Sequence, residues 1–180
     1  DSSRRYTHAP LGDQLELHGV RQFELDLHYR HGEGFEIFHL PIIDEQTTCR
    51  ALEDCLGAVR TWSDANPWHL PIMIWFEPKD DVDAIDDTLG ELAGRWDELE
   101  AAILDVIPRS RIITPDDVRG GYDTLPEAIA AQGWPTLGEV RGTVLFSMLD
   151  GGDHRTEYIG DSSNLAGRLM FVNGDGVDAP

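Results

Sequence analysis

The sequence predicts an α/β fold in which helices alternate with largely parallel strands. Two nearly continuous apolar runs, residues 70–78 and 142–150, have the composition of strands covered on both faces, as in parallel sheets. Amphipathic helical patterns separate the apolar runs along the chain. Ionisable side chains gather where several predicted strands end, and such strand ends build the active site of α/β barrels. We therefore expect an alternating α/β fold with a largely parallel sheet.

The first strand lies within residues 20–40 and alternates with period 2. Its apolar face consists of Phe23, Leu25 and Leu27. Its opposite face consists of Glu24, Asp26 and His28. A turn containing Gly32 and Gly34 leads to a second apolar run, residues 35–40, which carries His39 near its end. This unit predicts a hairpin-like pair of strands with two carboxylates and a histidine at one end.

The other elements follow from apolar spacing and from glycine and proline stops. A helical turn over residues 11–17 precedes the first strand, and a loop over 41–48 follows the second. The remaining predicted elements are a helix over 51–66, a strand over 70–78, an acidic helix over 82–107, a strand over 110–114, a loop over 116–121, a helix over 125–132, a strand over 142–150, a loop over 151–163 and a strand over 167–175.

The charge of the chain is strongly negative. It has 34 acidic and 14 basic residues, a net charge of −20, and Lys79 as its one lysine. A field of this sign repels nucleic acid and anionic membrane surfaces, so we expect no nucleic-acid partner, and an anionic substrate needs a local cation. The same composition suits a high-salt habitat or a secreted enzyme, and it needs no binding site to explain it.

A chain of 180 residues is long enough for one well-buried domain, so we expect a single domain over residues 1–180. No apolar stretch approaches the roughly 20 residues of a transmembrane helix, and no signal peptide is visible. The chain begins at Asp1, which suits a leader that has been removed.

Cys49 and Cys55 are the two cysteines of the chain. Along one continuous helix their Cα atoms would lie about 9 Å apart, so a disulfide requires Cys49 to lie in the loop before the helix. Two interpretations stay open: a pair of buried thiols, or a loop-to-helix disulfide, which favours a secreted or extracytoplasmic protein.

The carboxylates inside the first strand suggest a metal site. Glu24 and Asp26 lie about 7 Å apart on one strand face, which is unfavourable without a cation or hydrogen-bond donors. Glu77 ends a later strand beside Lys79. Each residue also has a simpler interpretation: Glu24 and Asp26 can pair with arginines such as Arg21, and Glu77 can form a salt bridge with Lys79. His39 can be a core histidine bonded to a backbone carbonyl.

Five segments carry a resemblance to a known family. They are HAPLGDQLELHGVRQFELDLH (8–28), FHLPIIDEQTTCRALEDCLGAVRTWSDANPWHLPI (38–72), FEPKDD (76–81), ITPDDVRGGYDTL (113–125) and GWPTLGEVRGTVLF (133–146). In this order and spacing they resemble the calcium-dependent phosphatidylinositol-specific phospholipases C of bacteria and fungi, which are TIM-type (β/α) barrel enzymes.

The resemblance implies roles for named residues. Glu24, Asp26 and Glu77 match the carboxylate ligands of a calcium ion, and three carboxylates suit a hard cation, with Mg²⁺ a weaker fit than Ca²⁺. His39 matches a catalytic histidine that faces the phosphate. Lys79 matches a lysine beside the site and is the candidate contact to the substrate phosphate.

The chain also departs from the family pattern. Members usually begin the barrel with a strand that ends in a catalytic histidine and a metal-binding asparagine, and no segment here matches that pair. Thr143 stands where members often have lysine. Six predicted strands fall short of eight. The resemblance and these departures therefore imply that residues 1–180 form a single, partial catalytic-barrel domain, with the first strand and the closing strands missing from the given chain.

The implied reaction is calcium-dependent phosphodiester cleavage of phosphatidylinositol-type lipids, which gives diacylglycerol and cyclic inositol phosphate. The implied partner is a phospholipid at a membrane surface. One alternative is a metal-dependent hydrolase of the glycerophosphodiester phosphodiesterase type, which uses a similar Glu-x-Asp pair. A second alternative is a non-catalytic acidic binding module on a degenerate barrel.

Overall fold

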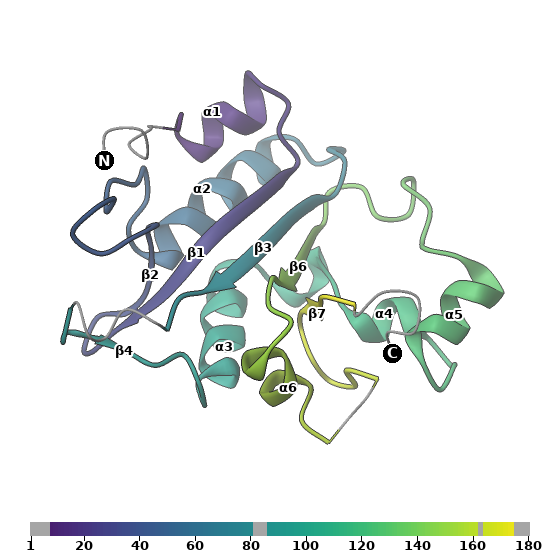
Figure 1. Ribbon diagram of the computed structural model, residues 1–180. Coiled ribbons are helices and arrows are strands. Elements are labelled where there is room, and N and C mark those ends of the chain that lie inside the picture. The colour runs from purple at the N-terminus through teal and green to yellow at the C-terminus, as the bar shows by residue number, and fades with distance from the viewer. Residues whose placement is uncertain (1–7, 81–85, 162–163, 175–180) are drawn as a thin grey trace.

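A computed structural model of the chain describes residues 8–80, 86–161 and 164–174 (Figure 1). Seven strands and several mostly short helices form this part of the chain. The elements are α1 (Leu11–Glu16), β1 (Gln22–Arg30), β2 (Gly34–Ile37), α2 (Leu52–Ala65), β3 (Ile72–Pro78), β4 (Leu89–Gly90), α3 (Trp96–Val106), the 3-10 turn η2 (Arg109–Arg111), β5 (Ile112–Ile113), α4 (Pro115–Arg119), α5 (Leu125–Gln132), β6 (Val144–Met148), α6 (Asp153–Ile159) and β7 (Phe171–Val172).

One mixed sheet joins all the strands, in the order β2-β1-β3-β6-β5. Its centre is parallel, because β1 pairs with β3 and β3 pairs with β6 in the same direction. β2 and β4 pair with β1 in the antiparallel direction. β5 and β7 both pair with β6, β5 near its start and β7 near its end. The parallel centre confirms the α/β class.

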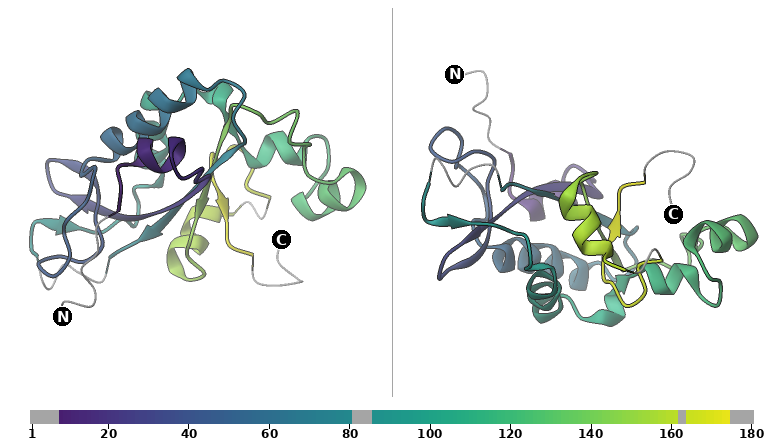
Figure 2. Two further views of the ribbon diagram at one scale, coloured as in Figure 1. Left: turned by 90° about the horizontal axis from the view of Figure 1, so that it is seen from above. Right: turned by 60° about the horizontal axis from the view of Figure 1, so that its bottom comes forward.

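The core lies between the sheet and the helices along one of its faces. Leu25 and Leu27 of β1 and Ile74 of β3 are buried there, and α2 contributes Leu52 and Leu56 to the same cluster. α2 packs beside both α1 and α3. Figure 2 shows α1 and α2 on the same side of β1 and β3. This burial explains the period-2 alternation of β1, because every second side chain of the strand points into this core.

The opposite face of the sheet is covered only in part. On β3 the alternate positions Met73, Trp75 and Glu77 are half-buried, whereas Ile72, Ile74 and Phe76 are buried. β6 repeats this pattern. In the part of the chain that the structure describes, the sheet stays open and does not close into a barrel.

The hairpin of β1 and β2 forms as predicted. Gly32 and Gly34 in its turn have φ angles of 82° and 93°, a left-handed conformation that favours glycine. The strands pair from Arg30 opposite Gly34 to Leu27 opposite Ile37. His39 comes two residues after β2 ends, and its backbone belongs to the loop that follows. The prediction of a long second strand over 35–40 is therefore too long at its C-terminal end.

The predicted helix over 82–107 is wrong in its first half. Residues 86–95 form a turn, the short strand β4 and a second turn, and α3 begins only at Trp96. Leu89 and Gly90 pair with Arg30 and Tyr29 instead of joining a helix. Gly94 has a φ of 78°, which is incompatible with a continuous helix. The first residues of the predicted helix, 82–85, lie outside the described residues.

Two predicted loops contain helices. α4 begins one residue before the predicted loop 116–121 and occupies most of it. Its start is a capping box in which the side chains of Thr114 and Asp117 bond reciprocally to the backbone, with Pro115 in the first turn. α6 lies within the predicted loop 151–163. The last predicted strand, 167–175, is reduced to β7.

Candidate metal centre and adjacent cavity

Strand pairing brings the three predicted carboxylates together. The parallel register of β1 and β3 places Asp26 opposite Glu77. Glu24 lies two residues before Asp26 and therefore on the same face. One carboxylate oxygen from each of Glu24, Asp26 and Glu77 lies within 4.8 Å of the other two. The predicted cluster is thus present, at the carboxyl end of β3 and opposite it in the first half and middle of β1.

Lys79 joins this cluster from the residues that follow β3. Its Nζ lies 2.9 Å from Oδ1 of Asp26 and 2.7 Å from Oε2 of Glu77. Burial acts to lower the pKa of Lys79, but hydrogen bonds to Glu77 and Asp26 outweigh it, so the pKa lies above its usual value. The salt bridge considered for Glu77 and Lys79 is therefore present, and it also includes Asp26.

The alternative pairing of Glu24 and Asp26 with Arg21 is wrong. Arg21 donates hydrogen bonds to the carbonyl oxygens of Leu15 and Val20, and its guanidinium stacks 4.5 Å from the ring centre of Trp62. It therefore ties α1 to the start of β1 and to α2, away from the carboxylates.

The carboxylate cluster fits a calcium ion. Calcium binds oxygen at about 2.3–2.6 Å, so two of its ligand atoms lie at most about 5 Å apart. The 4.8 Å limit on the oxygens of Glu24, Asp26 and Glu77 satisfies this condition. Hard oxygen donors are the ligands that calcium prefers, and the partial exposure of all three side chains leaves room for water or substrate oxygens.

His39 lines the same cavity as Glu24 and Asp26, which has a volume of about 760 Å³. Its Nδ1 lies 3.2 Å from Oδ2 of Asp44, which is buried. Leu40 and Asp44 exchange two backbone hydrogen bonds, so a tight turn brings Asp44 back to His39. His39 is therefore held by a carboxylate at one ring nitrogen, and its interpretation as a core histidine bonded to a carbonyl is wrong.

His28 has a structural role. It is fully buried, its ring stacks on Phe38 at 3.8 Å between centroids, and its Nε2 lies 2.9 Å from the carbonyl oxygen of Phe38. Burial lowers the pKa of His28 to about 4, so the ring is neutral near pH 7. The guanidinium of Arg50 also lies 3.9 Å from the ring centre of Phe38. Phe38 is thus held by both residues, immediately before His39 in the chain.

Other strand-end polar residues do not join the cluster. Asp117 caps α4 and pairs with Arg109. Asp150 accepts hydrogen bonds from the backbone N–H groups of Gly152 and Arg155. These carboxylates stabilise local turns, and β5 ends level with Met73, near the start of β3 and away from Glu77. Asp175 lies outside the described residues.

Sequence reasoning missed Asp44 and Arg50. Asp44 orients His39, and Arg50 lies on Phe38 and bonds to Glu36 at 3.0 Å. Both lie in irregular backbone, where no periodicity exists to indicate direction. The one available signal was the short spacing of five residues between His39 and Asp44.

Cys49 and Cys55 form a disulfide, with Cα atoms 5.2 Å apart. Cys49 precedes α2 and Cys55 lies in its first turns, so the loop-to-helix disulfide is confirmed and the pair of free thiols is wrong. The bond fixes the loop that lines the cavity to α2. Within the described residues, no helix has the length and apolar character to span a bilayer.

Comparisons with known proteins identify the relatives of this chain. The chain has no match among curated proteins. A family model described as "Phosphoinositide phospholipase C, Ca2+-dependent" matches residues 30–179. The match includes His39, Glu77 and Lys79, and begins after Glu24 and Asp26.

Solved structures agree with this match. A Ca²⁺-dependent phosphatidylinositol-specific phospholipase C from Streptomyces antibioticus has a TM-score of 0.64 and 26% identity, over 86% of this chain and 56% of that one. An apo calcium-dependent phosphoinositol-specific phospholipase C from a Gram-negative Pseudomonas species has a TM-score of 0.67 and 22% identity, over 92% and 59%. The myoinositol complex of a calcium-dependent phosphoinositol-specific phospholipase C from a Gram-negative Pseudomonas species has a TM-score of 0.68 and 21% identity. That match covers 92% of this chain and 60% of the other chain.

The chain therefore spans less than two thirds of the length of these structures. Its open mixed sheet corresponds to part of their TIM-type barrel, which confirms the predicted fold class. The matched family, the shared fold and the extent of the family match lead to one conclusion: this chain belongs to the Ca²⁺-dependent phosphoinositide phospholipase C family.

Proposed function

We propose that this chain carries the calcium site and one catalytic histidine of an enzyme that cleaves phosphatidylinositol-type lipids to diacylglycerol and cyclic inositol phosphate. The observation that carries the proposal is the cluster of Glu24, Asp26 and Glu77, with oxygens within 4.8 Å of one another, beside a cavity lined by His39. Membership of the phospholipase C family supports the same reaction.

Glu24, Asp26 and Glu77 are the proposed calcium ligands. When bound, calcium supplies a Lewis acid for a phosphate oxygen and the attacking inositol hydroxyl. The protein's part is to hold three carboxylates on two rigid neighbouring strands, so that their positions depend on the β1–β3 register and not on a loop. Lys79 adds a positive charge beside them and is the proposed contact for a substrate phosphate.

His39 is the proposed proton-transfer residue. Its Nδ1 faces Asp44 at 3.2 Å, so Nδ1–H donates to that carboxylate and Nε2 is left for the cavity. A neutral Nε2 accepts a proton from a hydroxyl group, and a protonated Nε2 returns one to a leaving oxygen. Asp44 keeps the ring in the tautomer that this exchange needs.

A membrane surface outside the cytoplasm is the proposed place of action. The turn between His39 and Asp44 exposes two large apolar side chains, Ile42 at 74% and Ile43 at 50%, next to the cavity. Such side chains suit contact with lipid. The Cys49–Cys55 disulfide suits an oxidising, extracytoplasmic compartment.

Product analysis tests the proposal. A protein that contains this chain together with the rest of the barrel is added to phosphatidylinositol vesicles with calcium or with a chelator, and water-soluble products are separated. We expect cyclic inositol phosphate with calcium, its loss with the chelator, and at least about 100-fold slower release for Asp26→Asn. Glu53→Gln, an exposed change in α2, is the matched control and keeps the rate.

Two results would contradict the proposal. Cleavage that yields only acyclic products points to the glycerophosphodiester phosphodiesterase reaction. Calcium binding without any cleavage points to a non-catalytic binding module.

A further inference from the structure

The ammonium group of Lys79 occupies the carboxylate cluster. Lys79 is the one lysine among 180 residues, and 13 of the 14 basic residues are arginine. Its Nζ bonds to Asp26 at 2.9 Å and to Glu77 at 2.7 Å, and its side chain is 18% exposed. Two of the three proposed calcium ligands therefore already have a cationic partner within the protein.

A calcium ion and this ammonium group need the same negative charge. Calcium takes six to eight oxygen ligands at about 2.3–2.6 Å, so Asp26 and Glu77 must turn their oxygens toward the ion. An ammonium group hydrogen-bonded to the same oxygens would then lie within a few ångströms of a divalent ion, where repulsion is strong. Full engagement by both cations at once is unfavourable.

The side chain of Lys79 can leave without moving the backbone. Its backbone N–H donates to the carbonyl oxygen of Leu27 at 3.0 Å, which fixes the main chain to β1. The four-carbon side chain is flexible. The nearby carboxylate of Asp80 is already bonded to the N–H of Leu92 at 2.8 Å and to His154 at 3.3 Å. A displaced ammonium group would therefore turn toward solvent at the cluster.

We propose that calcium binds to this chain by exchange, with Lys79 neutralising Asp26 and Glu77 in the metal-free protein and leaving them when the ion binds. The proposal rests on the calcium site proposed above. It makes Lys79 a resident counter-ion that keeps the empty cluster together and weakens its affinity for calcium.

The solitary lysine gives a direct probe. Reductive methylation with isotope-labelled formaldehyde places methyl groups on Lys79 and retains its positive charge, and a Lys79→Arg variant, which lacks the side-chain signal, assigns the resonance. We expect calcium to shift the Lys79 methyl resonance with a saturable dependence on calcium concentration. The same midpoint is expected from calorimetry on the methylated protein.

A second measurement compares calcium affinities. By calorimetry, Lys79→Met binds calcium about tenfold or more tightly than the unchanged chain, because the competing charge is gone. Lys79→Arg keeps the positive charge, so its calcium affinity rises less than that of Lys79→Met. Arg141→Met removes an equal charge from an exposed residue whose guanidinium bonds to the carbonyl oxygen of Trp68, and is the matched control, with affinity within about twofold.

The outcomes separate this inference from the calcium site itself. Calcium binding that leaves the Lys79 resonance unmoved, with unchanged or weaker affinity in Lys79→Met, overturns the exchange and keeps the site. No calcium binding by the unchanged chain or by Lys79→Met overturns both. Without calcium, Lys79→Met is expected to unfold at lower denaturant concentration than the unchanged chain, because Asp26 and Glu77 then face each other uncompensated; circular dichroism checks that it folds.

Discussion

Two histidines, His28 in β1 and His39 in the loop after β2, differ in what their surroundings allow. His28 is fully buried, with Nδ1 lacking a hydrogen-bond partner among the described residues and Nε2 at the Phe38 carbonyl. His39, by contrast, is partly exposed to a cavity and has a carboxylate at Nδ1. Burial suits His28 to packing. The cavity and the carboxylate beside His39 support the proton transfer proposed for it.

The neutral state of His28 predicts a pH-dependent stability. Its pKa falls from about 6.5 in the unfolded chain to about 4 in the folded protein, so the unfolded state binds more protons between these values. The free energy of unfolding therefore falls as the pH drops through this window, by about 3 kcal/mol in full. Above pH 6.5 this contribution is fully present.

His28→Phe isolates the effect, because phenylalanine keeps a ring against Phe38 and cannot take a proton. We expect the variant to be less stable than the unchanged chain at pH 7.5, owing to the lost hydrogen bond to the Phe38 carbonyl. At pH 4.5 that deficit should shrink or reverse by about 2–3 kcal/mol. Urea unfolding at both pH values measures it, and a deficit that is equal at the two values would contradict the assigned pKa.

For single residues, the sequence predicted well which carboxylates share a strand face, and it did not predict the partner of His39. Period-2 alternation determines which residues of β1 share a face, so Glu24 and Asp26 could be grouped from the order of the residues alone. Asp44 depends on the path of an irregular turn in which Ile42 has a φ of 65°. No local pattern predicts that path.

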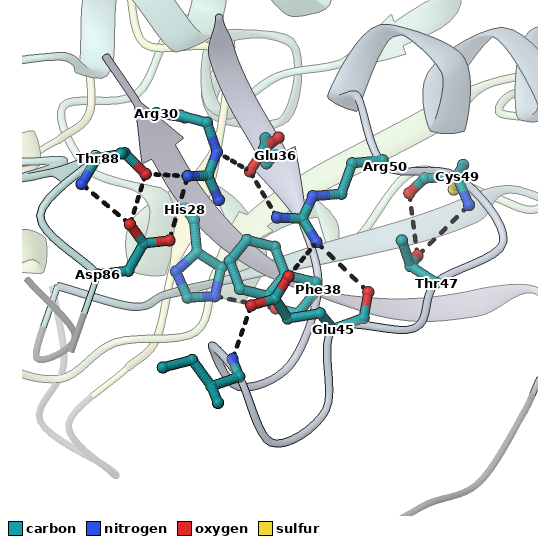
Figure 3. A network of polar contacts seen from close by, with 11 residues as sticks. His28, Arg30, Glu36, Phe38, Glu45, Thr47, Cys49, Arg50, Asp86 and Thr88 are labelled. Carbon is teal, nitrogen blue, oxygen red and sulfur yellow. Dashed lines mark hydrogen bonds and ion pairs between the residues drawn. The ribbon is translucent and has the colours of Figure 1, made fainter.

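Among the elements, the β1–β2 hairpin is held by an ionic network (Figure 3). Buried Glu36 bonds to Arg30 at 2.8 Å and to Arg50 at 3.0 Å, and Arg30 continues to Asp86 and Thr88 beside β4. Burial acts to raise the pKa of Glu36, but hydrogen bonds from Arg50 and Arg30 outweigh it and lower the pKa. The network connects β2, β4 and the loop before α2.

Glu36→Gln should destabilise the fold, since two partly buried arginines lose their shared carboxylate. We expect a loss of about 2–3 kcal/mol in the free energy of unfolding, measured with denaturant at pH 7. Glu45→Gln is the matched control, because Glu45 is exposed and meets Arg50 only at 3.4 Å. That control should cost less than about 1 kcal/mol, and equal losses in the two variants would show that Glu36 has no special role.

The disulfide has its own prediction. Replacing Cys49 and Cys55 together by serine releases a short loop, and the entropic model gives a loss of about 2 kcal/mol. Reduction of the unchanged chain should produce a similar loss in the same denaturant experiment. A change below about 0.5 kcal/mol in both would mean that packing alone holds the loop to α2.

The elements were predictable where apolar spacing was long and regular. α2 lies within one residue of its predicted bounds at each end, and β3 and β6 fall inside the predicted apolar runs. The helix predicted over 82–107 failed because Leu89 is buried by strand pairing and not by a helical face. A buried leucine fits either pattern, so only the tertiary partner decides.

For the whole molecule, the incomplete cover of one sheet face agrees with a chain that spans 56–60% of similar barrels. The α/β class could be predicted from the apolar runs, and the barrel type from the resemblance to the family. The strand order could not, because β5 lies beyond β6 and not between β3 and β6. Pairing of short strands depends on long-range contacts that one sequence does not reveal.

Glu24, Asp26 and Glu77 form one calcium site in the function proposed for this chain. A crystal structure of the chain grown in calcium, with the ion located by its anomalous scattering, shows whether the three carboxylates share an ion. We predict one ion bonded to an oxygen of each carboxylate at about 2.3–2.6 Å. An ion bound only elsewhere, or none in the cluster at saturating calcium, would contradict the claim.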